Sequence, residues 1–271
     1  MHDAPSTDDL DRPLLETLRY DALTATPSST DVARVREHAT LGAYGPDQLA
    51  AVDRNAPKPL TMGLFVGGLF AGIPLIVTLV YLVRGEGDTA FAGLVLTAGI
   101  FVVPGALGVI GAVVSRRNRW RRHTRVALFA EANGLGFRPV ADAALVPPAV
   151  RSAGSPTDVM HADLVTGRVQ GQQVSLGVRT SRVTTKDPQE THHLVWAALQ
   201  LDPLWAGRAT GWHRLAARVG ELRPDKTEFD LWRDEEWVVV GFTSQTGSLD
   251  VVPALMAMID VALATQNGEA A

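Results

Sequence analysis

The chain has 271 residues, a net charge of −4 and no cysteine. The absence of cysteine excludes disulfides, thiolate metal sites and a cysteine nucleophile, and it suits a soluble part that lies in the cytoplasm. Charge is unevenly distributed, because residues 115–126 carry six arginines and no acid, whereas the segments before and after them are acidic. The basic stretch is therefore a local feature of an otherwise acidic protein.

Residues 1–59 are predicted to form a polar cytoplasmic segment of short helices, part of which we expect to be disordered. A proline and several acids precede leucines at helical spacing, which indicates a first short helix. A second helix is predicted over residues 31–40, with Ser29 or Thr30 as its cap, and a third over residues 47–54. Proline, serine and threonine between these pieces argue against a compact domain formed by this segment alone.

Two long apolar runs follow, residues 60–83 and 89–114, joined by a short polar loop. Each is longer than the roughly 20 apolar residues that cross a membrane as a helix. No Asp, Glu, Lys, Arg or His occurs within 60–83 or 90–114. We therefore expect a transmembrane hairpin of two helices over residues 60–114. The other interpretation, two core helices of a soluble protein, is disfavoured because two adjacent runs of this length carry no charge.

The distribution of basic residues predicts the orientation of this hairpin. The cytoplasmic ends of membrane helices are rich in Lys and Arg. Residues 115–126 form a basic juxtamembrane stretch after the second run. The loop between the runs, in contrast, contains one base, Arg84, and two acids, Glu86 and Asp88. Both termini are therefore predicted to face the cytoplasm of a bacterium, a source suggested by the excess of arginine over lysine. The residues expected at the membrane surface, against anionic lipid headgroups, are Arg116, Arg117, Arg119, Trp120, Arg121, Arg122 and Arg125.

Small residues are frequent in both apolar runs. Glycines four positions apart let helix backbones approach closely, and the residues predicted to serve in helix packing are Gly63, Gly67, Gly68, Gly72, Gly105, Gly108, Gly111 and Ala112. We favour packing of the two helices within one chain, and self-association through these residues stays open. Because no acidic or basic residue and no histidine lies inside the spans, a transport path is not expected.

The remaining residues, 127–265 with a tail at 266–271, are predicted to form a cytosolic α+β domain with an antiparallel sheet of about five strands flanked by helices. A helix is expected to continue from the second span to a stop at Asn133-Gly134, followed by a connection rich in proline. The predicted strands are residues 159–166, 172–180, 193–201, 227–232 and 237–243, of which the second alternates polar and apolar residues and should be half-buried. A short helix is predicted near residues 212–219 and a final one over residues 249–264.

Candidate chemistry in this domain is sparse. A metal site could be built from His161, Asp163 and one of His192 or His193, but solvated or capped histidines are the favoured interpretation. The sequence contains neither a G-x-S-x-G motif nor a phosphate-binding loop. We therefore assign no catalytic, cofactor-binding or metal-binding residue, and we expect no cofactor. Trp205 and Trp212 are expected either to fill the core or to form an exposed patch for a partner.

Three segments carry a resemblance to known proteins. Residues 129–139 read Phe-Ala-Glu-Ala-Asn-Gly-Leu-Gly-Phe-Arg-Pro, and compatible patterns occur from Gly171 to Val178-Arg179-Thr180 and over residues 196–203. These segments resemble a group of uncharacterised actinobacterial membrane proteins. The resemblance implies two membrane spans, a basic juncture and a cytoplasmic α+β domain, and it implies no activity or site residues.

The function expected from these features is that of a membrane-anchored interaction or scaffolding module, which binds a protein partner or associates with itself. An alternative is a membrane-tethered, hydrolase-like enzyme that uses His161, Asp163 and His192 or His193. A third is an accessory subunit of an envelope or export complex. A nucleic-acid partner is not expected, because the arginines would point all round their helix and the domain that follows is acidic.

Overall fold

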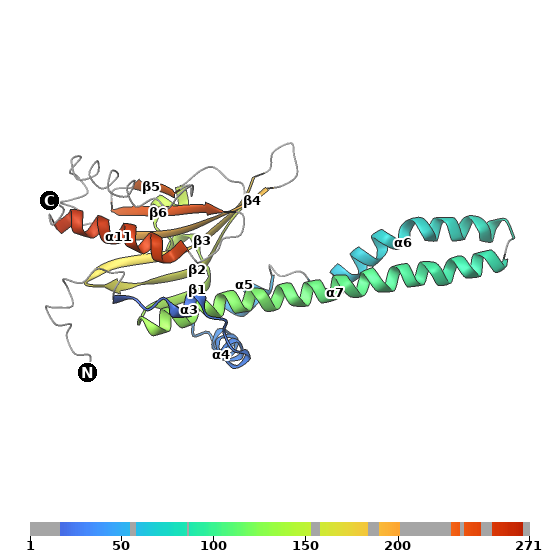
Figure 1. The fold of residues 1–271 in the computed structure, drawn as a ribbon, viewed down its shortest axis with the longest axis horizontal. Helices are drawn as coiled ribbons and strands as arrows, with labels where there is room; N and C mark the ends of the chain where they lie inside the picture. Colours follow the sequence, from blue (N-terminus) through green and yellow to red (C-terminus); the bar gives the residue numbers. More distant parts are fainter. Residues whose placement is uncertain are drawn as a thin grey trace. The chain divides into compact units, whose positions relative to one another are not determined.

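The computed structural model describes residues 17–54, 58–85, 87–152, 158–183, 190–200, 229–233, 236–244 and 251–267. By packing, the chain divides into two compact units (Figure 1). One unit comprises Met1–Gln48 and His123–Ala271, and the other is Leu49–Arg122. The five-part division along the chain that the sequence suggests stays a prediction.

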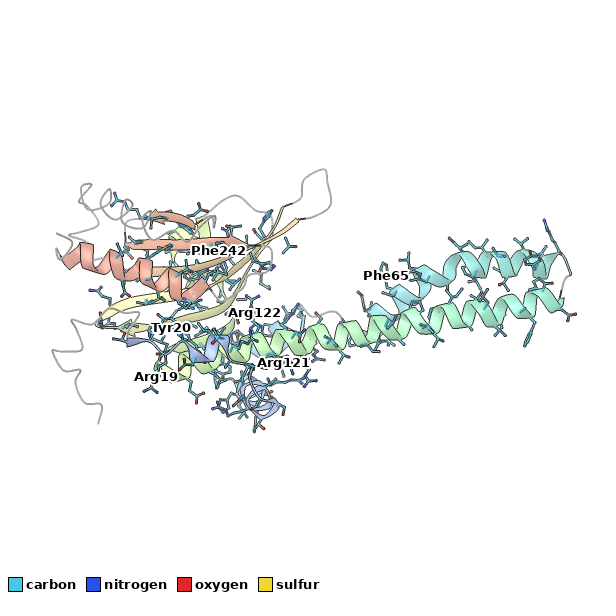
Figure 2. The ribbon with its side chains drawn as sticks, in the orientation of Figure 1. Arg19, Tyr20, Phe65, Arg121, Arg122 and Phe242 are labelled. Carbon is cyan, nitrogen blue, oxygen red and sulfur yellow. The ribbon has the colours of Figure 1, made fainter. Side chains whose placement is uncertain are left out.

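The smaller unit contains two long helices, α6 (Pro59–Val83) and the first part of α7 (Gly87–Ala132). Both are long and apolar enough to cross a membrane. Among the described residues, all large exposed hydrophobic side chains except Leu41, Leu145 and Val159 lie between Leu60 and Val114. Phe65, for example, is 67 % exposed on α6 (Figure 2). The outer surface of this hairpin is therefore almost entirely apolar.

Glycine lets the backbones of α6 and α7 approach each other. A Cβ atom added to Gly63 would lie 3.1 Å from the carbonyl oxygen of Gly105, and one added to Gly67 would lie 2.8 Å from that of Phe101. Gly108 faces Met62 and Val66 in the same way, and Ala112 is buried. In contrast, a Cβ atom on Gly68, Gly72 or Gly111 would meet no atom within 4 Å. Only part of the small-residue set therefore lies between the two helices.

The larger unit is built on a six-stranded antiparallel sheet in the order β1-β2-β3-β4-β6-β5. The strands are β1 (Gly136–Ala141), β2 (Asp158–Val169), β3 (Gln172–Val183), β4 (Glu190–Gln200), β5 (Phe229–Arg233) and β6 (Trp237–Ser244). The five predicted strands correspond to β2 to β6. The sixth, β1, was missed because Pro139 indicates a connection, but proline is tolerated at a sheet edge, which is where β1 lies.

Helices cover both faces of the sheet. Helix α11 (Val252–Asn267) lies across one face and contacts β4 and β6 (Figure 1). The other face, which we call the α8 face, is covered by the 3-10 turn η1 (Ala143–Leu145) and helix α8 (Pro148–Ser152). A core cluster on the α8 face joins Val150 of α8 to Trp196 of β4 and Val239 of β6.

The prediction that β3 is half-buried is wrong. Val174, Leu176 and Val178 are buried as expected, but the alternating polar residues Ser175 and Arg179 are buried as well, at 2 % and 5 % exposure. Local alternation indicates an exposed face only when no later segment covers it. Here η1 and α8, which lie outside the strand sequence, cover the face that the polar residues line.

The N-terminal segment packs on the end of α7. The main-chain N–H of Arg19 donates to Oδ1 of Asn133 (2.8 Å), and the Asn133 amide donates back to the Arg19 carbonyl (3.1 Å). Tyr20 stacks on Phe129, with ring centroids 5.7 Å apart. Described residues of this segment thus belong to the larger unit, and they include α3 (Asp21–Thr24).

Helix α4 (Ser29–Thr40) follows α3 and begins two residues before the predicted start. Its cap is Ser28, so the expectation that Ser29 or Thr30 caps it is wrong. The Ser28 hydroxyl accepts from the N–H of Asp31, and the Asp31 carboxylate accepts from the N–H of Ser28. This reciprocal pair requires an acid three residues after the cap, and only Ser28 has one at that spacing. The third predicted helix is α5 (Gln48–Arg54).

Candidate functional site

The histidines and the acid proposed for a metal site do not come together. A β-bulge between Ala162 and Val165 interrupts β2, and Asp163 within it has a φ of +54°. The bulge breaks the alternation that would place His161 and Asp163 on one face. Asp163 is fully buried, and its Oδ1 lies 2.5 Å from Nδ1 of His123 on α7.

The other two histidines are also apart from Asp163. His193 lies 3.0 Å from the Thr180 hydroxyl, measured from Nδ1. His192 is opposite Ser181 in the register of β3 and β4. In the described part of the chain, no three His, Asp or Glu side chains are grouped so as to hold a metal ion. The hypothetical metal site is therefore not formed by His161 and Asp163.

The α8 face instead carries buried polar atoms without partners. Seven buried side-chain nitrogen or oxygen atoms of the described residues have no hydrogen-bond partner, and five of them lie on this face. These five are His161 Nδ1, Ser175 Oγ, Arg179 Nε, Arg179 Nη2 and Trp196 Nε1. A buried polar group without a partner costs about 1–3 kcal/mol of stability. Their grouping on one face marks this region as the candidate site.

Arg179 and His161 are opposite each other on β3 and β2. Burial lowers the pKa of the Arg179 guanidinium, which nevertheless stays charged because arginine is not deprotonated in proteins. Burial is also the main cause of a lowered pKa at His161, and the positive charges of Arg179 and Arg151 lower it further. His161 is thus held in its neutral form beside a permanent positive charge.

A cavity of about 420 Å³ opens beside Arg179. Arg179, Leu194 and Thr243 form a row across β3, β4 and β6, since each is opposite the next in the strand register. The wall is completed by Trp232, whose indole N–H donates to the carbonyl oxygen of Ala149 on α8 (3.0 Å). The lining residues are Arg179, Ser181, His192, Leu194, Asp230, Leu231, Trp232 and Thr243.

Gly241 makes room for the side chains of Trp232 and Leu194 in this cavity wall. A Cβ atom at Gly241 would lie 2.6 Å from Cη2 of Trp232 and 2.8 Å from Cδ1 of Leu194. Gly177 has the same role beside Arg179, because a Cβ atom there would lie 3.0 Å from Cζ2 of Trp196. Glycine at these two positions therefore allows the tryptophan rings to lie directly on the strands.

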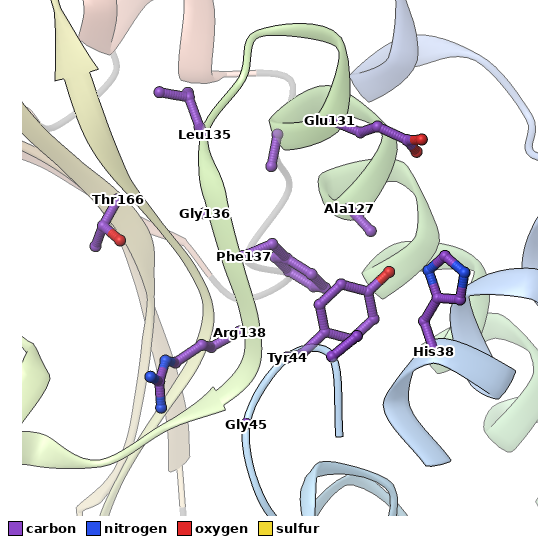
Figure 3. Close-up of a pocket in the computed structure, with 12 residues that line it drawn as sticks. His38, Tyr44, Gly45, Ala127, Glu131, Leu135, Gly136, Phe137, Arg138 and Thr166 are labelled. Carbon is purple, nitrogen blue, oxygen red and sulfur yellow. The ribbon is translucent and has the colours of Figure 1, made fainter. Parts of the chain in front are cut away.

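A second cavity, of about 550 Å³, lies between the N-terminal segment, α7 and β1 (Figure 3). Figure 3 shows the rings of Tyr44 and Phe137 next to each other, and their centroids are 5.2 Å apart in an edge-to-face arrangement. Glu131 at its rim is bonded to Arg34 (2.9 Å), a contact that lowers the pKa of the Glu131 carboxyl. Burial raises the pKa of the Tyr44 hydroxyl. The charged acid of this cavity is thus already paired.

The arginine stretch lies on α7, and part of it binds α5. Arg116 forms an ion pair with Asp53, and Nη1 of Arg119 is 3.4 Å from the carbonyl oxygen of Val52. Trp120 is only 3 % exposed, and its indole nitrogen is 3.4 Å from Oδ1 of Asp53. Arg117 is exposed, while Arg121, Arg122 and Arg125 are half-buried. The expected contact of these residues with a membrane surface stays a prediction.

The proposed partner patch at Trp205 and Trp212 lies outside the described residues, as does the short helix predicted near them. The chain matches no family model, and searches of curated proteins and of solved structures also find no match. The cavity beside Arg179 is not among the sites predicted from the sequence. The signal that could have found it is the permanent charge of Arg179 in a strand whose neighbour, β4, is apolar on both faces.

Proposed function

We propose that this chain is an integral membrane protein whose hairpin of α6 and α7 anchors the sheet unit to a bacterial cytoplasmic membrane. The observation that carries the proposal is the apolar outer surface of the hairpin between Leu60 and Val114. Such a large exposed apolar surface is unfavourable in water and favourable in lipid. The 25-residue α6 is long enough to span the hydrocarbon core.

In the proposed orientation both termini face the cytoplasm and the connection between α6 and α7 faces outside. Support comes from the arginines of residues 115–126, which would lie near anionic headgroups on the cytoplasmic side. Arg117 is exposed and available to headgroups. The pairing of Arg116 with Asp53 would add a protein contact that holds α5 against the helix just outside the membrane.

The anchored unit is proposed to act as an interaction or scaffolding module, with a protein partner, a second copy or an envelope complex as its target. Binding is favoured over the alternative of hydrolysis by the position of Asp163. This acid is fully buried and bonded to His123, so it is not available to activate water beside His161. Two surface cavities of ordinary ligand size are compatible with binding.

The membrane proposal is tested with single cysteines, since the natural chain has none. Thr89→Cys reports the connection between the spans and Glu37→Cys reports α4; both positions are exposed. In intact cells a membrane-impermeant maleimide should label Thr89→Cys only, and Glu37→Cys should react after permeabilisation. Labelling of Glu37→Cys in intact cells, or release of the protein by alkaline carbonate without detergent, would contradict the proposal.

The interaction proposal is tested by crosslinking the full-length chain in its native membrane. A discrete crosslinked species larger than the monomer is expected, and its mass separates self-association from a partner of another kind. A chain that stays monomeric under crosslinking, while remaining in the membrane fraction, would contradict the module proposal and leave the anchoring proposal standing.

A further inference from the structure

Strand β1 lies at the edge of the sheet, and among the described strands it has a neighbour, β2, on one side only. In an antiparallel pair, every second residue points its N–H and C=O groups away from the partner strand. Val140 is such a residue, because its N–H donates to Oε1 of Gln48 on α5, outside the sheet (3.0 Å). Arg138 and Gly136, two and four residues earlier, therefore direct their groups to the same side. We call these two positions the free edge of β1, since the described residues make no hydrogen bond to them there.

The cavity of Figure 3 borders this free edge. Its lining includes the three consecutive residues Gly136, Phe137 and Arg138. Adjacent side chains of a strand point to opposite faces, and Figure 3 shows Phe137 and Arg138 on opposite sides of β1. A cavity that touches all three residues must therefore reach the main chain at the edge of the strand. Its facing wall is the connection between α4 and α5 at residues 43–45.

Gln48 shows which chemical group suits this edge. Its side-chain amide carries a C=O and an N–H group, as a peptide group does, and it binds the N–H of Val140 as the main chain of a neighbouring strand would. The amide of Gln48 occupies only this last position. An extended peptide presents C=O and N–H groups at the spacing of a strand, so it can bind the free edge at Gly136 and Arg138 together.

The charges beside the free edge favour an acidic residue in such a peptide. Arg138 is exposed, and it takes part in none of the ion pairs formed by the described residues. Its guanidinium lies at the cavity wall, because a Cβ atom added to Gly45 would be 3.1 Å from Nη1 of Arg138. The acid of this cavity, Glu131, is already paired with Arg34. The unpaired charge next to the free edge is therefore positive.

The opposite face of β1 favours an apolar residue. The rings of Tyr44 and Phe137 pack edge to face there, and both line the cavity. Successive side chains of an extended peptide point to opposite faces, so one side chain would lie beside Arg138 and the next would lie against these rings. The free edge is thus complementary to a peptide in which acidic and apolar residues alternate.

We propose that the free edge of β1 binds an extended peptide segment of a partner protein as an added strand, with an acidic side chain beside Arg138 and an apolar one against the rings of Tyr44 and Phe137. This binding rests on the interaction function proposed above, and it gives that function a surface and a class of partner. All the contacts lie in the larger unit, so the binding can be measured in detergent whatever the topology of the hairpin.

The test uses the full-length protein in a neutral detergent and a synthetic peptide, Ser-Val-Glu-Val-Glu-Val-Ser, blocked at both ends. Calorimetric titration at constant ionic strength should give a dissociation constant of about 0.1 mM or lower, and absence of binding at about 1 mM peptide would overturn the proposal. Two twins are N-methylated, one at the valines and the other at the glutamates, so each lacks the N–H donors of one peptide edge. At least one twin should bind about tenfold more weakly. Equal binding of both twins and the parent would exclude an added strand.

A charge reversal tests the contact with Arg138. Arg138→Glu should weaken binding of the acidic peptide at least about fivefold, and it should strengthen binding of a basic twin in which both glutamates are lysine. The matched control is Arg168→Glu, which reverses the same charge at an exposed position of β2 outside the cavity lining and should bind both peptides as the natural protein does. Equal effects of the two variants would reduce the binding to general charge attraction and overturn the proposal.

Amide hydrogen exchange, followed by mass spectrometry, gives a readout that does not depend on charge. The acidic peptide should slow exchange in residues 136–138, whose outward N–H groups it would bind, and leave residues 172–180 of the interior strand β3 unchanged. Binding without slower exchange in residues 136–138 would place the peptide elsewhere and overturn the proposal.

Crosslinking of Arg138→Glu in native membranes separates this proposal from the interaction function itself. Loss of a crosslinked species whose mass fits a partner of another kind would support the proposal. A species that persists in Arg138→Glu, with no peptide binding, would overturn the free edge as the surface and leave the interaction function standing. Loss of a species with twice the mass of the chain, again with no peptide binding, would assign the free edge to a second copy and overturn the peptide partner.

Discussion

Nδ1 of His123 lies 2.5 Å from Oδ1 of Asp163, in a contact that joins α7 to β2. Both side chains are buried, at 6 % and 0 % exposure. Asp163 also has a positive φ, a backbone conformation that is uncommon outside glycine and is tolerated by Asp and Asn. The bulge in β2 thus turns an acid toward His123 and bonds it there, so it holds the last part of α7, residues 123–132, against the sheet.

Replacing either member of this pair should destabilise the larger unit. Asp163→Asn retains a residue that tolerates the positive φ but removes the acceptor charge, and His123→Ala removes the imidazole that contacts the buried acid. We expect a loss of about 3 kcal/mol in the free energy of unfolding for each. Denaturant unfolding followed by tryptophan fluorescence measures it, with exposed Asp230→Asn as the control. A loss below about 0.5 kcal/mol, the size of a surface effect, would contradict the role of the pair.

Gly241→Ala should destabilise the sheet at the cavity wall. The added methyl group would lie 2.6 Å from the Trp232 ring and 2.8 Å from Leu194, so the ring must move. Overpacking of this kind costs about 1–3 kcal/mol. Gly136→Ala is the matched control, because its nearest neighbour would be 3.4 Å away, an ordinary contact. Equal melting temperatures for the two variants would contradict the prediction, because they would show that the Trp232 ring moves aside without loss of stability.

The stability of the protein should fall in mildly acidic solution because of His161. Its pKa is lowered in the folded state by burial and by two arginines, so the unfolded chain takes up a proton at a higher pH than the folded one. Stability is therefore unaffected by this group above about pH 6.5 and decreases as the pH falls below that value. His161→Gln should remove this part of the pH dependence. The two proteins are compared by denaturant unfolding from pH 7.5 to pH 5, and parallel curves would contradict the assignment.

The sequence predicted those parts of the fold that depend on local chemistry. Gly134, with a φ of +64°, ends α7 as expected. The strands predicted over residues 159–166 and 172–180 are β2 and β3, and the turn between them uses Gln170 and Gly171, both with positive φ. Such positions are visible because few residues adopt this conformation. Likewise, the strand predicted over residues 193–201 corresponds to β4, which lies between β3 and β6.

The candidate site depends on contacts between distant segments, and these were not visible in the sequence. Arg179 alternates with buried valines, a pattern typical of an exposed position on a half-buried strand. In the structure Arg179 is nevertheless buried, on the face of the sheet over which η1 and α8 return. The pairing of His123 with Asp163 was missed for a related reason, since a bulge changes which face a side chain takes and leaves no clear mark in a strand of ordinary residues.

Docking of the N-terminal segment should depend on Asn133. Its side chain makes three hydrogen bonds, two with the main chain of Arg19 and one with the carbonyl oxygen of Phe129. Asn133→Ala removes all three, and we expect a loss of about 1–2 kcal/mol. Cleavage by trypsin after Arg19 should become faster. Glu37→Ala, which changes an exposed residue of α4, is the control. Unchanged cleavage in Asn133→Ala would indicate that Tyr20 and its neighbours hold the segment without these bonds.

Substitutions at two adjacent glycines of α6 can distinguish packing within the hairpin from association between chains. Gly67 faces α7, since a Cβ atom there would lie 2.8 Å from the Phe101 carbonyl oxygen, whereas Gly68 faces open space. Gly67→Ile should therefore force the two helices apart, at a cost of about 1–3 kcal/mol, and lower the melting temperature in detergent. Gly68→Ile should melt as the natural protein does. Crosslinking in native membranes is then compared for the two variants: loss of a larger species only in Gly68→Ile would assign self-association to the outer face of α6. Equal destabilisation by both variants would contradict the contact between α6 and α7 at Gly67. Both variants add the same side chain, but one adds it between the two helices and the other adds it to the open surface of α6.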